Sequence, residues 1–128
     1  LHYNLPAGGV EAGESVIEAV IREAKEEASV DVEVGPIAFV LENAPHLSLN
    51  KSGIHGLHLM FDCTIKEGSI PAFPENPDPN QTGVKWIPLS QLDEIVLYPN
   101  IKQHILEYAY NRSNNLSLIE SHTLDSNT

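Results

Sequence analysis

The chain has 128 residues, with seven Lys or Arg against eighteen Asp or Glu, and its formal net charge is −11 with His neutral. With 41 % hydrophobic residues, no apolar run near the roughly 18 residues of a membrane span and no signal peptide, it is expected to be one soluble, cytoplasmic domain. The acidic balance disfavours nucleic acid and membrane surfaces as partners, because both are anionic, and leaves cations or cation-bridged ligands.

The first part of the chain predicts a short strand, a glycine-rich turn and a helix. The chain begins with Leu1 rather than Met, and residues 1–5 are typical of a strand. A glycine-rich turn, PAGGVEAG, follows over residues 6–13. Ser15 followed three residues later by Glu18 is the capping-box pattern of a helix start. We therefore predict a helix over residues 15–28.

The rest of the chain predicts strands, a long loop and a second helix. A strand is expected over residues 56–65, with one buried face made by Leu57, Leu59, Phe61, Cys63 and Ile65. Because Cys63 is the only cysteine, an internal disulfide and a cysteine-based zinc site are excluded. The other expected elements are strands over residues 30–34 and 37–41 around a Gly35-Pro36 turn, a loop over 71–82, a strand over 83–87, a helix over 101–110 and a polar, poorly ordered tail over 113–128.

The chemistry is concentrated in the first helix. At about 100° per residue, its apolar side chains form one arc that would face the core, made by Val16, Ile17, Val20, Ile21, Ala24 and Ala28. Glu27 falls inside this arc and Glu23 lies beside it, whereas Arg22 and Lys25 lie on the solvent side. Glu23, Glu26 and Glu27 are spaced i, i+3, i+4, so their like charges repel one another. A divalent cation would remove that repulsion, and carboxylate oxygens suit Mg²⁺ or Mn²⁺.

An acid-rich helix is, by itself, more often a solvated surface than a metal site. The wider pattern favours the metal site, because six residues stand at the spacing G-x5-E-x7-R-E-x-x-E-E: Gly8, Glu14, Arg22, Glu23, Glu26 and Glu27. This closely resembles the Nudix box, G-x5-E-x7-R-E-U-x-E-E-x-G-U with U aliphatic, of the Nudix (MutT-like) hydrolases. Two positions depart from it, since Ala24 is small for an aliphatic position and Ser29 replaces a glycine. Because Ser lacks the freedom of glycine for positive φ, we expect a local adjustment at Ser29 that leaves the acids in place.

A looser resemblance continues beyond the box. The segment Val84–Leu89 followed by Gln91-Leu92 is similar to the W-x-P-L-x-x-L segment of many family members, so the resemblance covers residues 5–109. It implies an α/β (α+β) fold, an α/β/α sandwich around a mixed sheet, with a Nudix hydrolase domain over residues 1–112 and the tail over 113–128. Family members usually carry one or two further strands before the Pro-Ala-Gly-Gly turn. N-terminal strands are therefore expected to be missing, either because the sequence is a fragment, which we favour, or because a partner chain completes the sheet edge.

The resemblance also implies a reaction, hydrolysis of the diphosphate linkage in a nucleoside diphosphate joined to another moiety. Glu23, Glu26 and Glu27 would hold Mg²⁺ or Mn²⁺ together with the backbone carbonyl of Ala7. Glu23 or Glu26 would deprotonate the attacking water. Metal ions neutralise phosphate oxygens and lower the pKa of bound water, which agrees with these roles.

Other matched residues would position the site. Arg22 would orient one of the box carboxylates through a charge-assisted hydrogen bond. Glu14 would tie the glycine-rich loop to the helix, and Gly8 and Gly9 belong to that substrate-positioning loop. The remaining matched positions are therefore expected to shape the site rather than to react.

Many family members add an acid from a loop shortly before the Trp segment. In this chain that register carries Gln81, so an extra ligand or base at that position is not expected. Glu75 and Asp78 in the same loop are the alternatives, although acids in a loop rich in Pro and Asn are more often simply solvated.

The substrate is less well defined by the sequence. The Pro6-Ala7-Gly8 turn and Pro45 are similar to features of the ADP-ribose and nucleotide-sugar pyrophosphatases in the family.

His55 and His58 lack metal-type spacing and are expected to be packed or surface residues. Two other interpretations stay open: a non-catalytic Nudix-like domain that binds a nucleotide and regulates another process, and an acidic helix that docks a protein partner. Family members are often dimers, so a homodimer is also open.

Overall fold

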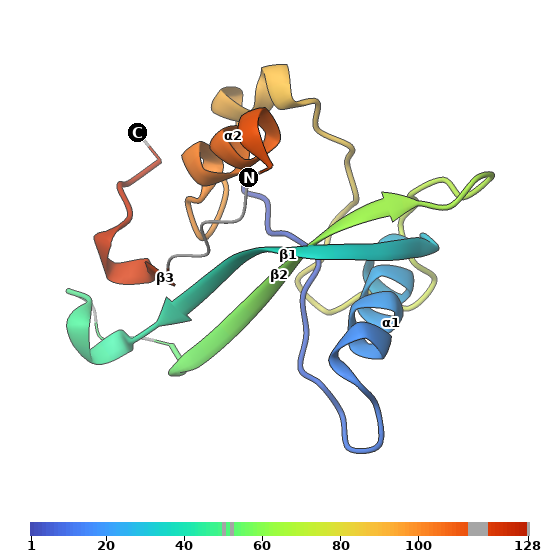
Figure 1. Ribbon diagram of the computed structural model, residues 1–128, viewed down its shortest axis with the longest axis horizontal. Coiled ribbons are helices and arrows are strands. Elements are labelled where there is room, and N and C mark those ends of the chain that lie inside the picture. Colours follow the sequence, from blue (N-terminus) through green and yellow to red (C-terminus); the bar gives the residue numbers. More distant parts are fainter. Residues whose placement is uncertain (50, 52, 113–117, 128) are drawn as a thin grey trace. The chain divides into compact units, whose positions relative to one another are not determined.

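The computed structural model describes residues 1–49, 51, 53–112 and 118–127 (Figure 1). Its elements are α1 (Val16–Ala28), β1 (Val32–Asn43), β2 (Gly56–Ile65), α2 (Lys102–Asn111) and β3 (Leu118–Glu120), with short 3-10 helices at Pro45–Leu47, Leu89–Glu94 and Ser121–Thr123. The chain divides into two compact units, an α1 unit of Leu5–Pro36 and Asp62–Ile87 and an α2 unit of Leu1–Asn4, Ile37–Phe61 and Pro88–Thr128. Within the described ranges, every helix is too short or too polar to reach across a bilayer.

The sheet has three strands in the order β2-β1-β3. β3 pairs with β1 in parallel, with Val40 opposite Leu118 and Glu42 opposite Glu120. The arrows of β1 and β2 run in opposite directions in Figure 1. The sheet is therefore mixed, and the predicted α+β fold with a mixed sheet is confirmed.

α1 begins with the predicted capping box. The Glu18 N–H donates to the Ser15 hydroxyl at 3.1 Å, and the Ser15 N–H donates to the Glu18 carboxylate at 2.9 Å. These bonds satisfy two backbone donors that a helix start leaves without intrahelical partners. The helix predicted over residues 15–28 is confirmed, since the observed helix begins one residue later, at Val16.

The C-terminal half of α1 is anchored in the core of the α1 unit. That core is built from buried Ala28, Val30 and Val32, with Ala24, Val34, Cys63, Ile65 and Val84 packed against it. The expectation that the whole apolar arc faces the core is only partly right. Ala24 and Ala28 do so, whereas Val16, Ile17 and Ile21 are 38 %, 44 % and 41 % exposed. The strands of this unit thus supply packing partners to the last turns of the helix, where the matched acids lie.

β1 is one strand across the Gly35-Pro36 pair, and the predicted turn between two strands is wrong. The strand runs without interruption from Val32 to Asn43. β3 pairs only with residues 40–42 of β1. Pro36 lies outside this pairing, so the backbone N–H that proline lacks is not needed for a hydrogen bond to β3. Gly35 also allows a close approach, because a Cβ atom there would lie 2.6 Å from the backbone oxygen of Asp62. A Gly-Pro pair is therefore compatible with a continuous strand here.

We expect Gly35→Ala to destabilise the protein by about 1–3 kcal/mol, since the methyl group would push the Asp62 backbone away from β1. Gly83→Ala is the matched control, because a Cβ atom at Gly83 would meet no heavy atom within 4 Å. Urea unfolding followed by circular dichroism measures both changes. Equal stabilities of the two variants would contradict the close approach.

β2 has the predicted range, but its buried face is not uniform. Leu57 and Leu59 are 64 % and 41 % exposed. Met60 packs against the core of the α2 unit, whereas Cys63 and Ile65 pack against the core of the α1 unit. The five-residue buried face expected from alternation therefore holds only for the second half of the strand, where Cys63 packs against the core but is half-buried rather than buried.

The strand expected over residues 83–87 is not formed. In the part of the chain that the structure describes, these residues are irregular and belong to no sheet. Val84 packs against the core of the α1 unit, but Trp86 is 69 % exposed. Alternating apolar residues form a strand only when a neighbouring edge pairs with their backbone.

The α2 unit has its own core, built from buried Leu41, Leu97, Ile101 and Ile119. α2 confirms the predicted C-terminal helix. The strand predicted over residues 1–5 is reduced to a single bridge, in which the Tyr3 N–H donates to the Val96 carbonyl at 2.8 Å and the Tyr98 N–H donates to the Tyr3 carbonyl at 3.0 Å.

Residues 118–127, expected in a poorly ordered tail, instead form part of the α2 unit. Ile119 of β3 is buried in its core. The Leu97 N–H donates to Asn127 Oδ1 at 3.2 Å, and Asn127 Nδ2 donates to the Leu97 carbonyl at 2.8 Å. These contacts are to residues distant in sequence, which composition does not reveal. Residues 113–117 and 128 of the expected tail lie outside the described residues.

Candidate active site

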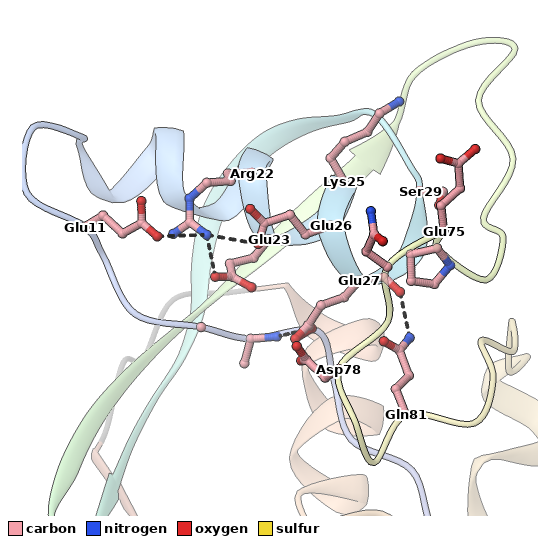
Figure 2. A pocket seen from close by; sticks show the side chains of 14 residues that line it. Glu11, Arg22, Glu23, Lys25, Glu26, Glu27, Ser29, Glu75, Asp78 and Gln81 are labelled. Atoms are coloured by element: carbon pink, nitrogen blue, oxygen red, sulfur yellow. Dashed lines mark hydrogen bonds and ion pairs between the residues drawn. The ribbon is translucent and has the colours of Figure 1, made fainter.

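A cleft of about 700 Å³ in the α1 unit gathers most of the matched residues (Figure 2). The glycine-rich loop, the last two turns of α1 and the loop over residues 71–82 form its walls. The lining residues are Ala7, Gly8, Glu11, Arg22, Glu23, Lys25, Glu26, Glu27, Ser29, Pro74, Glu75, Asn76, Asp78 and Gln81.

Arg22 joins the glycine-rich loop to the acids of α1. Its Nε and Nη2 donate to the two carboxylate oxygens of Glu14 at 3.0 and 2.7 Å. Its Nη1 donates to Glu23 at 2.7 Å and to Glu26 at 3.2 Å, and its Nη2 also donates to the Gly9 carbonyl at 2.9 Å. Such charge-assisted, bidentate bonds fix direction as well as distance. One guanidinium thus orients three carboxylates and the loop.

Glu14 is the acid held most firmly in this arrangement. Its side chain is 15 % exposed and also accepts the Glu11 N–H at 2.8 Å. The hydrogen bonds from Arg22 and from the Glu11 backbone lower the pKa of Glu14 to about 2, from its usual 4.5. The contact shows how Glu14 can tie the loop to the helix.

This lowered pKa predicts a loss of stability in acid. The stabilisation is fully present above about pH 4.5 and is lost as the pH falls through about 2, because the unfolded chain binds the proton first. We expect Glu14→Gln to be less stable than the wild type at pH 7, with the difference shrinking between pH 4.5 and pH 2. Thermal unfolding over this range measures it, with Glu67→Gln, an exposed position, as control for the lost charge. A constant difference at all pH values contradicts the ion pair.

Glu27 is half-buried, whereas Glu26 is exposed, and the hydrogen-bond partner of Glu27 is not Arg22 but a backbone N–H. Its carboxylate accepts the Ala7 N–H at 2.9 Å. Burial raises the pKa of Glu27, and the negative charges of Glu23, Asp78 and Glu26 raise it further, against the lowering effect of the Ala7 N–H. The protein therefore collects carboxylates here that repel one another, which a cation would relieve.

The chemistry of this donor set fits a hard divalent cation. Carboxylate oxygens are the ligands that Mg²⁺ and Mn²⁺ prefer. Among the described residues, however, no three Asp, Glu, His or Cys side chains are already placed around one ion position. Arg22 holds Glu23 and Glu26, and the Ala7 N–H holds Glu27. Binding of an ion to these acids thus requires an exchange of partners within the cleft.

Ser29 ends α1 in the left-handed conformation. Its φ is 54° and its ψ is 32°, and its N–H donates to the carbonyls of Ala24 and Lys25. The local adjustment expected at this position is therefore not seen, because Ser29 itself takes the left-handed conformation, in which glycine would have no steric penalty.

We expect Ser29→Gly to stabilise the protein by about 0.5–1 kcal/mol, because relief of the left-handed strain exceeds the extra chain entropy that glycine brings. Ser29→Ala is the control, since it removes the hydroxyl and keeps the Cβ atom. Chemical unfolding should rank Gly above both Ser and Ala. A glycine variant no more stable than the alanine variant contradicts the strain.

The structure adds roles that the sequence pattern did not provide. Gln81, in the register of the loop acid, donates its Nε2 hydrogen to the Glu27 backbone carbonyl at 2.8 Å. Glu11 lies 3.8 Å from Arg22, and Lys25, assigned to the solvent side, lines the cleft. Gln81 and Glu11 depend on loop conformation, for which local spacing carries no signal.

His55 and His58 are surface residues, as expected. His55 lies in the α2 unit, 58 % exposed and 3.0 Å from Glu42, and its ring centroid is 5.8 Å from that of His46. His58 is also exposed. None of these residues lines the cleft.

Comparison with known proteins gives the family. The family model of the NUDIX domain matches residues 1–108. A relative from Caenorhabditis elegans named "Putative nudix hydrolase 1" is 33 % identical over 88 residues, which are 69 % of this chain and 21 % of the relative, so the chain spans about a fifth of its length. A solved structure of an ADP-ribose pyrophosphatase from Streptococcus suis is 24 % identical with a TM-score of 0.54, over 91 % of this chain and 79 % of that one, and shows a shared fold. With its family model matched over most of its length, the chain belongs to the NUDIX domain family.

Proposed function

We propose that this chain is a divalent-metal-dependent hydrolase that cleaves the diphosphate linkage of a nucleoside diphosphate joined to another moiety. The observation that carries the proposal is the placement of the box acids at one cleft, oriented by Arg22 and the Ala7 N–H. Membership of the NUDIX domain family supports the same reaction class.

Glu23, Glu26 and Glu27, with the Ala7 carbonyl, are the groups proposed to hold Mg²⁺ or Mn²⁺. The bound ion would neutralise phosphate oxygens and make hydroxide available near neutral pH. Arg22 orients Glu23 and Glu26, and one of these two carboxylates takes the proton of the attacking water. Glu26 is the more accessible, with a side chain 58 % exposed against 16 % for Glu23.

The charge of the cleft supports a cation requirement. Its lining carries the carboxylates of Glu11, Glu23, Glu26, Glu27, Glu75 and Asp78 against the basic groups of Arg22 and Lys25. A diphosphate is repelled by such a surface unless cations reverse the local sign. We therefore expect weak substrate binding without a divalent ion. The same acidity, −11 over the whole chain, disfavours nucleic acid as the partner.

ADP-ribose and nucleotide sugars are the first substrates we propose. A cleft of about 700 Å³ lies in the range of small-molecule sites, and the S. suis protein of similar fold is an ADP-ribose pyrophosphatase. We also propose a cytoplasmic location and a homodimer, which cell fractionation and sedimentation test.

The proposal is tested on the chain with ADP-ribose, nucleotide sugars and nucleoside triphosphates, each with Mg²⁺, with Mn²⁺ and with EDTA. Released nucleoside monophosphate is measured by chromatography. Turnover that needs the metal supports the proposal, and no turnover on any compound contradicts it. Tight nucleotide binding in calorimetry without hydrolysis would instead identify the regulatory domain, and a melting temperature indifferent to Mg²⁺ and Mn²⁺ would favour the protein-docking helix.

A further inference from the structure

The loop over residues 71–82 is attached to the C-terminal end of α1 at two points. The Ala72 N–H donates to the Ala28 carbonyl at 2.8 Å. The Gln81 Nε2 donates to the Glu27 carbonyl at 2.8 Å, across 54 positions of sequence. The last carbonyls of a helix have no intrahelical partners and form the negative end of its dipole. The two donors therefore close this loop onto the helix at both of its ends.

The Gln81 end of the loop carries an acid with it. The Gln81 N–H donates to the Asp78 carbonyl at 2.9 Å, which makes residues 78–81 one hydrogen-bonded turn. A turn of this kind fixes the position of Asp78 relative to Gln81. Anchoring the amide of Gln81 to the helix thus also fixes where Asp78 stands.

Asp78, and not Glu75, is the loop acid that faces Glu27. Figure 2 shows the Asp78 carboxylate beside the Glu27 carboxylate, whereas the Glu75 carboxylate points away from Glu27. The loop acid that faces Glu27 in this chain therefore stands three residues before Gln81.

We infer that Gln81 is a positioning residue, which anchors the 78–81 turn to the C-terminal end of α1 so that Asp78 faces Glu27 across the cleft. This inference rests on the proposed function for its effect on turnover. Its structural part, the anchoring itself, concerns this chain alone.

The chemistry of the anchor explains why an amide suits this position. The group that Gln81 contacts is a carbonyl oxygen at the negative end of a helix dipole. An N–H donor binds there, and a carboxylate would be repelled. Gln81→Glu, which restores an acid to the family register, should therefore release the turn rather than add a useful acid.

Amide hydrogen exchange, read by mass spectrometry on protein free of metal and substrate, tests the anchor without any activity. We expect Gln81→Ala to speed exchange of peptides covering residues 72–82 about three- to tenfold, Gln81→Glu at least as much, and Gln81→Lys, which keeps a donor, much less. Gln103→Ala and Gln103→Glu, at an exposed position of α2, are the controls. Unchanged exchange of α1 peptides shows that each variant is folded. Wild-type protection of residues 72–82 in folded Gln81→Ala overturns the inference.

A double-mutant cycle with Asp78 tests the consequence for turnover. We expect Gln81→Ala to lower kcat about tenfold with KM within twofold, and to have less than a twofold effect in an Asp78→Asn background, because the two residues act through one turn. Additive effects, or a Gln81→Glu enzyme as fast as the wild type, overturn the inference. If the wild type hydrolyses no nucleotide, the proposed function fails, while the exchange experiment still decides whether Gln81 anchors the turn.

Discussion

Glu27→Gln is expected to lower kcat by about 10²- to 10⁴-fold, because it removes one anionic ligand from the proposed metal site, where the ion contributes several kcal/mol. The fold should survive the substitution. Glutamine has the shape of glutamate, and its Oε1 can still accept the Ala7 N–H. Steady-state kinetics with Mg²⁺ and with Mn²⁺ measures the loss.

The same variant should be at least as stable as the wild type at neutral pH. Burial raises the pKa of Glu27, which means that folding disfavours its charged form above that pKa, and a neutral amide escapes this effect. Reduced activity with an equal or higher melting temperature therefore separates a functional acid from a structural one. Glu33→Gln, which removes a charge from an exposed position of β1, is the control. A Glu27→Gln enzyme within twofold of wild-type kcat refutes the metal assignment.

Arg22→Lys is expected to lower kcat by about 10²-fold even though it conserves the charge. Lysine cannot reproduce the planar fork that binds Glu14 through two nitrogens while also donating to Glu23, Glu26 and the Gly9 carbonyl. A displacement of about 1 Å in the reacting groups is enough for a loss of this size.

Arg22→Gln should be worse than Arg22→Lys in both activity and melting temperature, because it leaves the neighbouring carboxylates without their cation. Arg112→Gln, at the only other arginine of the chain, is the control. A divalent ion should restore part of the melting temperature of Arg22→Gln if the acids form a cation site. Full activity of Arg22→Lys contradicts a role for the guanidinium geometry.

The features that the sequence predicted well depend on neighbours along the chain. Ser15 and Glu18 cap α1 through a three-residue spacing, and the i, i+3, i+4 spacing of the acids places them along one cleft by helix geometry alone. The glycine-rich turn lies beside these acids, since the Ala7 N–H donates to Glu27; the metal contact of the Ala7 carbonyl stays a prediction.

The features that the sequence did not predict depend on contacts between distant residues. Gly35-Pro36 is a turn signal, yet the strand continues through it, with Gly35 close to the backbone of Asp62. The polar composition of residues 113–128 indicated a poorly ordered tail, yet β3 pairs with β1 and its Ile119 is buried in the core of the α2 unit. Gln81 donates to a carbonyl that lies 54 positions earlier. No periodicity in a single sequence encodes such pairings.

The position of Arg22 among the acids indicates whether the chain needs the proposed metal ion in order to fold. In small zinc domains the free energy of metal binding supplies the free energy of folding, so folding waits for the metal. Here an internal cation from the same helix already bridges Glu14, Glu23 and Glu26. If the acids hold a metal ion as proposed, folding and metal binding would be separate events, and a chain that has folded without the ion would become active when the ion is supplied. A chelator should therefore abolish the proposed hydrolytic activity reversibly, without unfolding the protein.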